Sequence, residues 1–429
     1  LSGLAAGVLG GAWVGELVGR NDLITFDIGG TSADIGIIRA GRFAETDARS
    51  TSLAGFPLLM PMIDVHTIGA GGGSIAHIDR GGAFRVGPQS AGAVPGPAAY
   101  GRGGKEPTVT DANIVLGRLD PDDFLGGGMK LDAKAAGEVI AELAGRLGLS
   151  VEEAAEGVLT ILNANMANAI RSRTVQKGID PRAFALVAMG GAGPLHGADV
   201  AAMLSIPEVI VPPYPGITSA MGLLTTDLKY DEIRTQFQTS ASPDLARLTS
   251  GFEEMEAALV ARFKADRVPD EAASFIRTGD LRYVGQGYEL QIDFPLGPLT
   301  IESLVGVWQE FHDRHAAEYG HAFTASTIEI VNIRVSGIGR LPKLPALKAA
   351  VGGPLKEAEL RRNRCVFRVG GSLEAFDTPV YQRTRLPVGT PFAGPAIIVQ
   401  QDSTTVVPPG AEAHVHPSGS IIMTLGGDQ

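Results

Sequence analysis

A glycine turn behind a short apolar segment carries the strongest chemical signal in the chain. Residues 26–34 read Phe-Asp-Ile-Gly-Gly-Thr-Ser-Ala-Asp. Consecutive glycines at a strand end expose backbone N–H groups that can surround phosphate oxygens, and neighbouring hydroxyls add donors. The residues expected to bind phosphate are Gly29, Gly30, Thr31 and Ser32. Asp27 could hold magnesium directly or through water, although a tight hairpin with a capping aspartate explains the same pattern.

A second glycine run lies between an apolar strand expected at 184–189 and a helix expected at 195–204. Residues 190–194 read Gly-Gly-Ala-Gly-Pro. Glycines at a strand-to-helix turn let adenosine or a phosphate approach the helix N-terminus and its partial positive charge. The candidate residues are Gly190, Gly191 and Gly193. The alternative is a turn that only packs the helix on the strand.

Two further acidic positions and one histidine are candidates for catalysis. Asp64 and His66 lie two residues apart on an expected strand, so they face the same way and could supply metal ligands together with Asp27, or an acid/base with its orienter. A hydrogen-bonded structural histidine is the alternative. Gly71 and Gly72, in the glycine run that follows, are counted among the cofactor-binding candidates. Asp111 opens an apolar helical stretch, where N-capping explains it as well as catalysis does.

Composition limits the classes of protein to which the chain can belong. Its 429 residues, 44% hydrophobic and 19% charged, fit a globular protein of about three domains. A net charge of -11 gives no electrostatic footprint for nucleic acid or anionic lipid. The run at 26–34 lacks the Gly-Lys-Ser/Thr of a Walker loop, and a strand follows it instead of the helix of a dinucleotide fingerprint. The single cysteine, Cys365, favours a reducing cytoplasm.

The order of the expected elements predicts an architecture. The first 19 residues, with one charge and six glycines, fit a buried helix of small residues better than a membrane span. Hairpins, two helices at 132–147 and 150–177, and a β-turn-α-β unit make up an α/β region at 1–229. Strands and helices in the order βαββαβ predict a ferredoxin-like α+β domain at 230–340. A linker and a small β-rich domain are expected at 341–429.

Taken together, these segments resemble the hydantoinase A/5-oxoprolinase family, which also includes a subunit of acetone carboxylase. The resemblance covers nearly the whole chain. The runs that carry it are residues 26–34, 64–76, 87–97, 100–104, 108–113, 189–194 and 394–398. Motifs of this length seldom recur by chance.

The resemblance implies an actin-like, sugar-kinase-like (ribonuclease H-like) ATPase fold, in which two lobes clamp ATP with Mg²⁺ or Mn²⁺. In that scheme residues 27–32 form a phosphate loop and residues 190–193 an adenosine-side turn. Similar proteins use ATP to activate a lactam or imide carbonyl, or a carboxylation substrate, as a phosphorylated intermediate. A larger partner of the hydantoinase B type then completes hydrolysis or carboxylation.

Two departures from the family pattern concern the start of the chain. Family members normally begin with another lobe that carries its own Asp-x-Gly-Gly-Thr loop, and no such copy precedes Asp27. Residues 2–7 read Ser-Gly-Leu-Ala-Ala-Gly where the family tends to have Ser-Gly-Pro-Ala-Ala-Gly. We therefore expect a fragment, or half of a split protein, from an ATP-dependent hydrolase that opens hydantoin or 5-oxoproline rings. An ATP-dependent ketone carboxylase subunit and a non-catalytic truncated scaffold are the alternatives.

Overall fold

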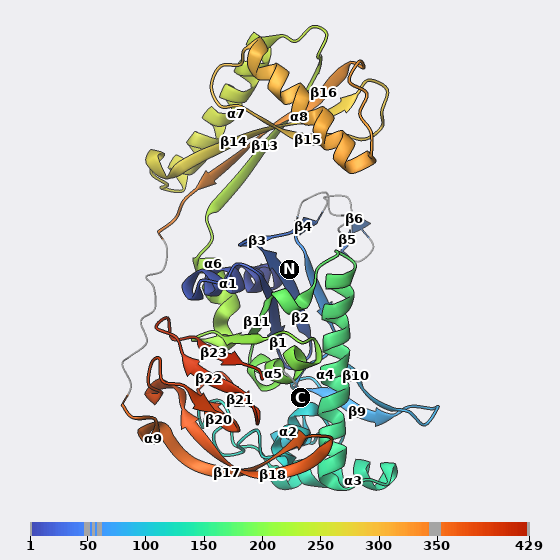
Figure 1. Ribbon diagram of the computed structural model, residues 1–429, viewed down its shortest axis with the longest axis vertical. Coiled ribbons are helices and arrows are strands. Elements are labelled where there is room, and N and C mark those ends of the chain that lie inside the picture. Colours follow the sequence, from blue (N-terminus) through green and yellow to red (C-terminus); the bar gives the residue numbers. More distant parts are fainter. Residues whose placement is uncertain (1, 47–51, 54–55, 58–61, 343–352, 427–429) are drawn as a thin grey trace. The chain divides into compact units, whose positions relative to one another are not determined.

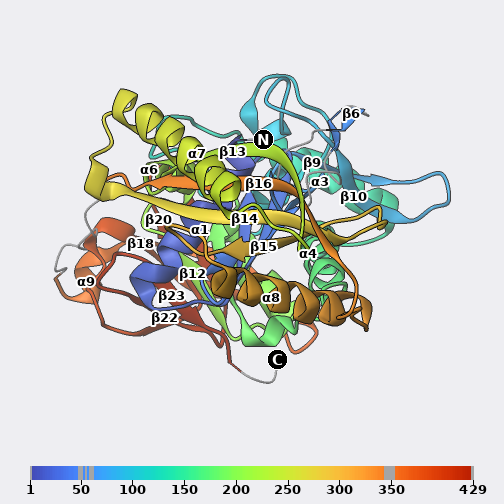
Figure 2. The ribbon, with the colours of Figure 1, turned by 90° about the horizontal axis from the view of Figure 1, so that it is seen from above.

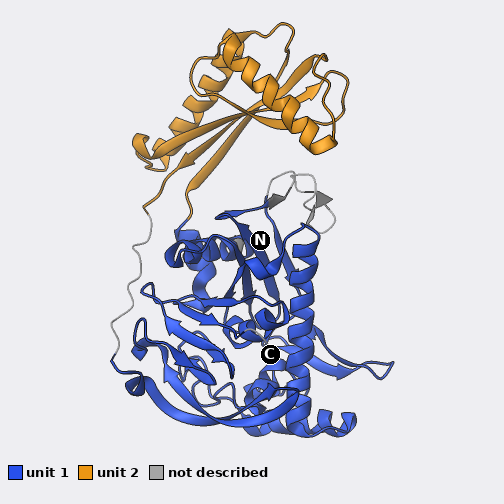
Figure 3. Ribbon diagram, in the orientation of Figure 1, with its two compact units in different colours: residues 1–225, 344–429 blue, residues 226–343 orange. Residues whose placement is uncertain are grey.

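The computed structural model describes residues 2–46, 52–53, 56–57, 62–342 and 353–426 (Figure 1). The chain divides into two compact units (Figure 3). Unit 1 contains residues 1–225 and 344–429, and unit 2 contains residues 226–343. The expected separate domain at 341–429 is wrong, because strands of this segment complete the main sheet of unit 1. Most of the linker predicted at 341–360 lies outside the described residues.

A mixed sheet forms the centre of unit 1 (Figure 1). Strand β1 (Leu23–Ile28) pairs antiparallel with β2 (Ala33–Arg39) and parallel with β11 (Ala185–Met189), which pairs parallel with β12 (Glu208–Val211). Their nearly continuous apolar sequences suit strands that are covered on both faces. The remaining strands of the sheet are β3 (Arg42–Phe43) and β8 (Val65–Ile68) beside β2, and β23 (Ile421–Thr424), β22 (Glu412–Val415) and β19 (Phe392–Ala393) beyond β12.

One face of this sheet is covered by α1 (Ser2–Val18), against which α6 (Thr218–Leu224) packs. Val8 and Val14 of α1 lie in one apolar cluster with Leu23 of β1. Glycines let the helix approach closely: a Cβ added at Gly11 would lie 2.2 Å from a side-chain carbon of Thr25. The expected buried helix of small residues is confirmed. Within the described residues, every helix is too short or too polar to cross a membrane.

The other face of the sheet carries most of the hydrophobic core. Ile24 and Phe26 of β1 pack in one cluster with side chains of α4 and α5. The helices of this region are α2 (Val109–Val115), α3 (Ala133–Leu147), α4 (Val151–Val175) and α5 (Gly193–Met203). A capping box of Ser150 and Glu153 begins α4, as the sequence predicts. Strands β9 (Ser74–Ile78) and β10 (Phe84–Ser90) form a separate antiparallel hairpin. Two short antiparallel pairs are β4 (Glu45–Thr46) with β7 (Met62–Ile63), and β5 (Ser52–Leu53) with β6 (Phe56–Pro57).

The C-terminal segment adds a second sheet to unit 1. Its strands, in spatial order, are β17 (Glu359–Val369), β18 (Ser372–Gln382), β20 (Ala396–Val399) and β21 (Thr404–Val407), preceded by the short helix α9 (Leu355–Ala358). Val380 and Ile397 of this sheet share an apolar cluster with Leu195 of α5. The loop between β20 and β21 is thereby held close to the start of α5.

Unit 2 has its own sheet and core. Its elements, in chain order, are β13 (Leu228–Thr239), α7 (Leu245–Ala265), β14 (Ala273–Tyr283), β15 (Leu290–Phe294), α8 (Ile301–Tyr319) and β16 (Ile328–Gly339). The predicted βαββαβ order is present, and Figure 2 shows α7 and α8 over the strands. The strands lie in the order β13-β16-β14-β15. The ferredoxin-like prediction is wrong, because that fold centres its first and third strands, whereas here the last strand, β16, separates the first two.

Candidate active site

Asp27 lies near the end of β1 in a row of polar side chains across three strands. The register pairs Asp27 with Asp34 of β2, and Asp34 with Thr67 of β8. Paired residues share a face of the sheet, here the face that α1 covers. The Thr67 hydroxyl donates to Asp34 Oδ1 over 2.6 Å.

The carboxylate of Asp27 is held in a defined position. The Ser219 hydroxyl, on α6, donates to its Oδ2 over 2.9 Å. A Cβ at Gly190, whose φ is +77°, would lie 2.4 Å from its Oδ1, so only glycine leaves room for this carboxylate. Burial raises the pKa of Asp27, the nearby charge of Asp34 adds to the increase, and the hydrogen bond from Ser219 opposes it. Burial likewise raises the pKa of Asp34, against the bond from Thr67.

The turn that follows β1 is open and is supported from one side by the second glycine loop. Gly29, Gly30 and Thr31 are exposed. The amide of Gly72 donates to Gly29 O over 3.1 Å, and that of Gly73 donates to Gly30 O over 2.7 Å. A Cβ at Gly71 would lie 2.7 Å from Gly29 O. The structure therefore brings these two glycine runs into direct contact.

The turn between β11 and α5 contacts the carboxyl end of β1. The Ala192 amide donates to Ile28 O over 3.0 Å, and the Gly190 amide donates to Pro215 O over 2.8 Å. Gly193 begins α5, where a Cβ would lie 3.2 Å from Phe26 O. All three glycine runs singled out from the sequence thus converge at the carboxyl ends of β1 and β11.

A cavity of about 270 Å³ opens beside these turns. Four glycines from the three runs line it: Gly29, Gly30, Gly72 and Gly191. Its walls also include Tyr100, Asn113, Phe124, Leu195, His196 and residues 400–404. Leu195 and His196 belong to α5, on the face of the sheet opposite Asp27, so the turn after β1 has the carboxylate on one side and the cavity on the other.

The loop at 400–404 is a contributor that sequence reasoning missed. Asp402 Oδ2 accepts from the amide of Gly216 over 2.8 Å. The buried guanidinium of Arg383 donates to Gln400 Oε1 over 2.6 Å and to the carbonyls of Val211 and Gly419. These bonds fix the C-terminal loop beside the end of β12. Polar residues in a turn between strands give no sequence signal of such a contact. The contact of Ser219 with Asp27 has no sequence signal either.

The predicted metal set of Asp27, Asp64 and His66 is wrong. Asp64 Oδ1 accepts from Arg173 Nη2 of α4 over 2.6 Å, and Lys177 pairs with its other oxygen. His66 is in register with Ile35, so it lies on the opposite face of the sheet from Asp27. In the part of the chain that the structure describes, no three His, Cys, Asp or Glu side chains are grouped to hold a metal.

Asp111 does not line the cavity, and its carboxylate is used within the fold. It sits in the first turn of α2, where it forms a capping box with Thr108. Its Oδ1 accepts from the Ala99 amide and its Oδ2 from the Thr108 amide, each over 2.9 Å. The side chain is fully buried, and this burial raises its pKa against the opposing hydrogen bonds. The contacts favour the capping interpretation over the catalytic one.

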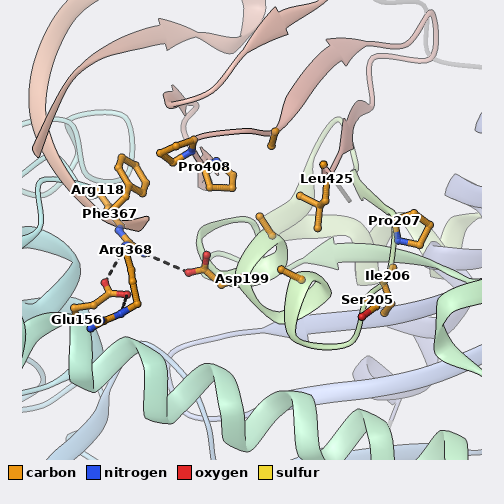
Figure 4. A pocket seen from close by; sticks show the side chains of 15 residues that line it. Arg118, Glu156, Asp199, Ser205, Ile206, Pro207, Phe367, Arg368, Pro408 and Leu425 are labelled. Carbon is orange, nitrogen blue, oxygen red and sulfur yellow. Dashed lines mark hydrogen bonds and ion pairs between the residues drawn. The ribbon is translucent and has the colours of Figure 1, made fainter. Parts of the chain in front are cut away.

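A larger pocket of about 420 Å³ lies elsewhere on unit 1, between α4, α5 and β17 (Figure 4). The buried guanidinium of Arg118 donates to Glu156 over 2.9 Å and to Asp199 over 3.3 Å, and it lies over the ring of Phe367. Its charge is therefore balanced by side chains of the same chain. This arrangement joins elements of the fold and uses the charge of Arg118 within the chain.

Comparisons with known proteins agree with the resemblance in the sequence. A family model described as hydantoinase/oxoprolinase matches residues 1–232, and one described as hydantoinase/oxoprolinase C-terminal domain matches residues 237–418. The caprolactamase subunit alpha of Pseudomonas jessenii is 35% identical over 99% of this chain and 61% of its own length.

Two solved structures resemble the chain over 98% of its length. The nucleotide-free structure of acetone carboxylase, from work on ATP-dependent acetone carboxylation, superposes with a TM-score of 0.86 at 28% identity. The ATP-dependent caprolactamase of Pseudomonas jessenii superposes with a TM-score of 0.77 at 34% identity. The chain covers 61% of each of those chains, so it spans about three fifths of the relatives it matches.

Proposed function

Because the chain belongs to the hydantoinase/oxoprolinase family, we propose that it provides a nucleotide-binding lobe of an ATP-dependent enzyme that opens cyclic amides. The observation that carries the proposal is the open turn after β1, which has the held carboxylate of Asp27 on one side and a cavity on the other. Hydantoin and 5-oxoproline rings are the proposed substrates.

The fold supports an actin-like, ribonuclease H-like lobe. Strands β8, β2 and β1 are antiparallel neighbours, β11 and β12 continue the sheet in parallel with β1, and helices cover both faces. Within such a lobe, residues 29–32 would hold the phosphates of ATP and residues 190–193 would lie on the adenosine side. The exposed glycines fit this function, because no side chain of their own covers the amides.

Asp27 fits a divalent cation that accompanies the phosphates. Its carboxylate is fixed by Ser219 and lies one residue from the turn, and Asp34 adds a second negative charge. Mg²⁺ or Mn²⁺ would be shared between phosphate oxygens and this carboxylate, directly or through water, and would neutralise charge during phosphoryl transfer. The protein itself contributes the alignment of the reactants.

The proposed reaction activates the amide oxygen. That oxygen forms a bond to the γ-phosphorus while the bond between the γ-phosphorus and the bridging oxygen breaks, and ADP leaves. Water adds to the activated carbon, the ring C–N bond breaks, and a second water releases phosphate from the acyl phosphate. One ATP and two waters thus yield ADP, phosphate and the ring-opened product, which is an amino acid from 5-oxoproline and an N-carbamoyl amino acid from hydantoin. A hydantoinase B-type partner is proposed for the hydrolytic steps.

Turnover of ATP tests the proposal. ADP release by the full-length protein with its partner should be stimulated by at least one cyclic amide from a panel of lactams and imides. Asp27→Asn should reduce that rate by about a hundredfold or more, because the cation loses a charged ligand. The matched control is Asp270→Asn, an exposed carboxylate in unit 2, which should have no effect. An undiminished rate in Asp27→Asn would remove this carboxylate from the mechanism.

A ketone carboxylase is the second candidate, favoured by the TM-score of 0.86 to acetone carboxylase. ATP turnover that requires bicarbonate and a ketone, with no response to cyclic amides, would select it. A non-catalytic scaffold is the remaining alternative. Micromolar binding of MgATP, measured by calorimetry, would contradict the scaffold.

A further inference from the structure

Three buried polar atoms without a hydrogen-bond partner belong to residues that line one cavity. Among the described residues, six buried side-chain nitrogen or oxygen atoms have no partner. Three of them are Asn113 Oδ1, His196 Nε2 and Ser403 Oγ, and all three residues line the cavity beside the glycine turns. A buried polar atom without a partner costs stability. A ligand in this cavity that donates to these atoms would remove that cost.

The hydrogen-bond network determines what His196 offers to that ligand. Asn163 Nδ2 donates to Asp199, so its Oδ1 is the atom that faces His196 Nδ1 over 2.9 Å. His196 Nδ1 therefore carries the proton, and Nε2 presents a lone pair. Burial lowers the pKa of His196 to about 3, so the ring is neutral at physiological pH. Nε2 is an acceptor that requires an N–H or O–H donor.

Asn113 offers a second acceptor. Its Nδ2 donates to Val109 O over 3.0 Å, within α2, which leaves Oδ1 directed away from that bond. Asn113 and His196 are each only 1% exposed. The hydroxyl of Ser403, on the C-terminal loop, can donate or accept. Residues that line the cavity thus carry two acceptors without a partner and one adaptable group.

The remaining walls suit a small planar ring. Tyr100, Phe124 and Leu195 contribute apolar surface, and Gly29 and Gly30 open the cavity toward the proposed phosphate turn. A volume of about 270 Å³ lies just below the usual range of ligand pockets, roughly 300 to 1,000 Å³. A ring of five to seven atoms fits this space with one edge near the turn.

We propose that this cavity binds the ring to be opened, with His196 Nε2 and Asn113 Oδ1 accepting from the two N–H groups of hydantoin, and one of them accepting from the single N–H of a lactam. The inference rests on the proposed function, because it places the amide next to the residues proposed to hold the phosphates. It also separates the two enzyme candidates. A cyclic amide or imide supplies N–H donors, whereas a simple ketone supplies none and would leave both acceptors unpaired.

A set of rings of one size tests the assignment without variants. Binding to the full-length protein is measured by calorimetry for 2-pyrrolidinone, N-methyl-2-pyrrolidinone and cyclopentanone, with hydantoin as a ring that bears two N–H groups. Hydantoin and 2-pyrrolidinone should bind about tenfold or more tightly than the two rings without N–H. Equal binding of all four rings, or no binding of any at millimolar concentration, would overturn the proposal.

Adenine also bears an amino group, so the same measurement is repeated in the presence of saturating ADP. If the cavity holds the substrate ring, ADP should leave the affinity for 2-pyrrolidinone unchanged or increase it. Displacement of 2-pyrrolidinone by ADP would assign the cavity to the nucleotide base and refute the proposal. N–H-dependent ring binding without any stimulated ATP turnover would support the cavity assignment and refute the proposed function.

A pair of variants locates the binding. Asn113→Leu should weaken binding of hydantoin by about tenfold, because it leaves one of the two N–H groups of the ring without an acceptor, and it should leave the dissociation constant for MgATP unchanged. The matched control is Asn165→Leu, on the exposed side of α4, which should change neither. Unaltered ring binding in a folded Asn113→Leu protein would contradict the role of this residue, and the ring series in the unmodified protein does not depend on that variant.

Discussion

Asp27 combines a partly desolvated charge with a fixed position, which is typical of a residue retained for function at a cost in stability. Its pKa is raised mainly by burial, with a contribution from Asp34. The folded chain therefore binds this proton more tightly than the unfolded chain. The resulting stabilisation is complete at low pH and is lost as the pH rises through the raised pKa.

Asp27→Asn should therefore stabilise the fold while it lowers the turnover rate. The amide oxygen of asparagine can still accept from Ser219, and the buried charge is removed. We expect a gain of about 1 kcal/mol in the free energy of unfolding at neutral pH. The gain should shrink as the pH falls through the raised pKa of the native carboxyl, because protonation then removes the same charge. Urea denaturation at several pH values measures this, and a destabilised variant at neutral pH would show that the carboxylate is a net structural contributor.

Gly190 is the residue at which backbone and site constrain each other most tightly. A Cβ there would lie 2.3 Å from Ile28 O and 2.4 Å from Asp27 Oδ1. Gly190→Ala should lose about 3 kcal/mol of stability and displace the carboxylate. The control is Gly371→Ala, also at positive φ but with open space around it, which should cost about 1 kcal/mol. Equal losses in the two variants would mean that the close contacts at Gly190 relax freely.

Among the elements that form the site, the loop between β20 and β21 lies farthest from β1 in the sequence. Asp402 holds Gly216, whose neighbour Pro215 accepts from the Gly190 amide. Asp402→Ala should increase amide hydrogen exchange at residues 215–217, because one wall of the cavity loosens. For the same reason it should weaken binding of 2-pyrrolidinone in the cavity about tenfold. The exposed Asp377 gives the control, Asp377→Ala. Unchanged exchange at 215–217 would show that the loop is held by other contacts.

Elements with local signals could be predicted from the sequence. The helix expected at 150–177 spans Val151–Val175, because Ser150 and Glu153 cap it. The glycine turns were found because their residue types alone predict exposed amides. Contacts between distant segments left no such signal: Ser219 and Asp402 look ordinary until the fold brings them to residues 27 and 216. The metal site predicted with Asp64 and His66 is wrong because the strand register places His66 on the other face of the sheet from Asp27. Local sequence does not reveal this register.

At the scale of the whole molecule, the two units should differ in their ability to fold alone. Unit 2 has its own core, which includes Phe252, Phe311 and Ile333. The core of unit 1 combines Phe26 of β1 with Ile421 of β23, so it is complete only with both ends of the chain. A fragment of residues 226–343 should therefore fold cooperatively, whereas a chain without residues 344–429 should not form a folded unit 1. Circular dichroism and amide-proton dispersion measure both, and a cooperatively folded residue 1–225 fragment would contradict this division.

Calorimetric titration of MgATP is the most direct test of the claim that the turn after β1 and Asp27 hold a triphosphate with its cation. The full-length protein should bind MgATP with a dissociation constant in the micromolar range. Removal of the divalent cation or the substitution Asp27→Asn should weaken binding about tenfold or more, and Asp270→Asn should not. Equal binding by the wild type and Asp27→Asn, with no dependence on the cation, would contradict it.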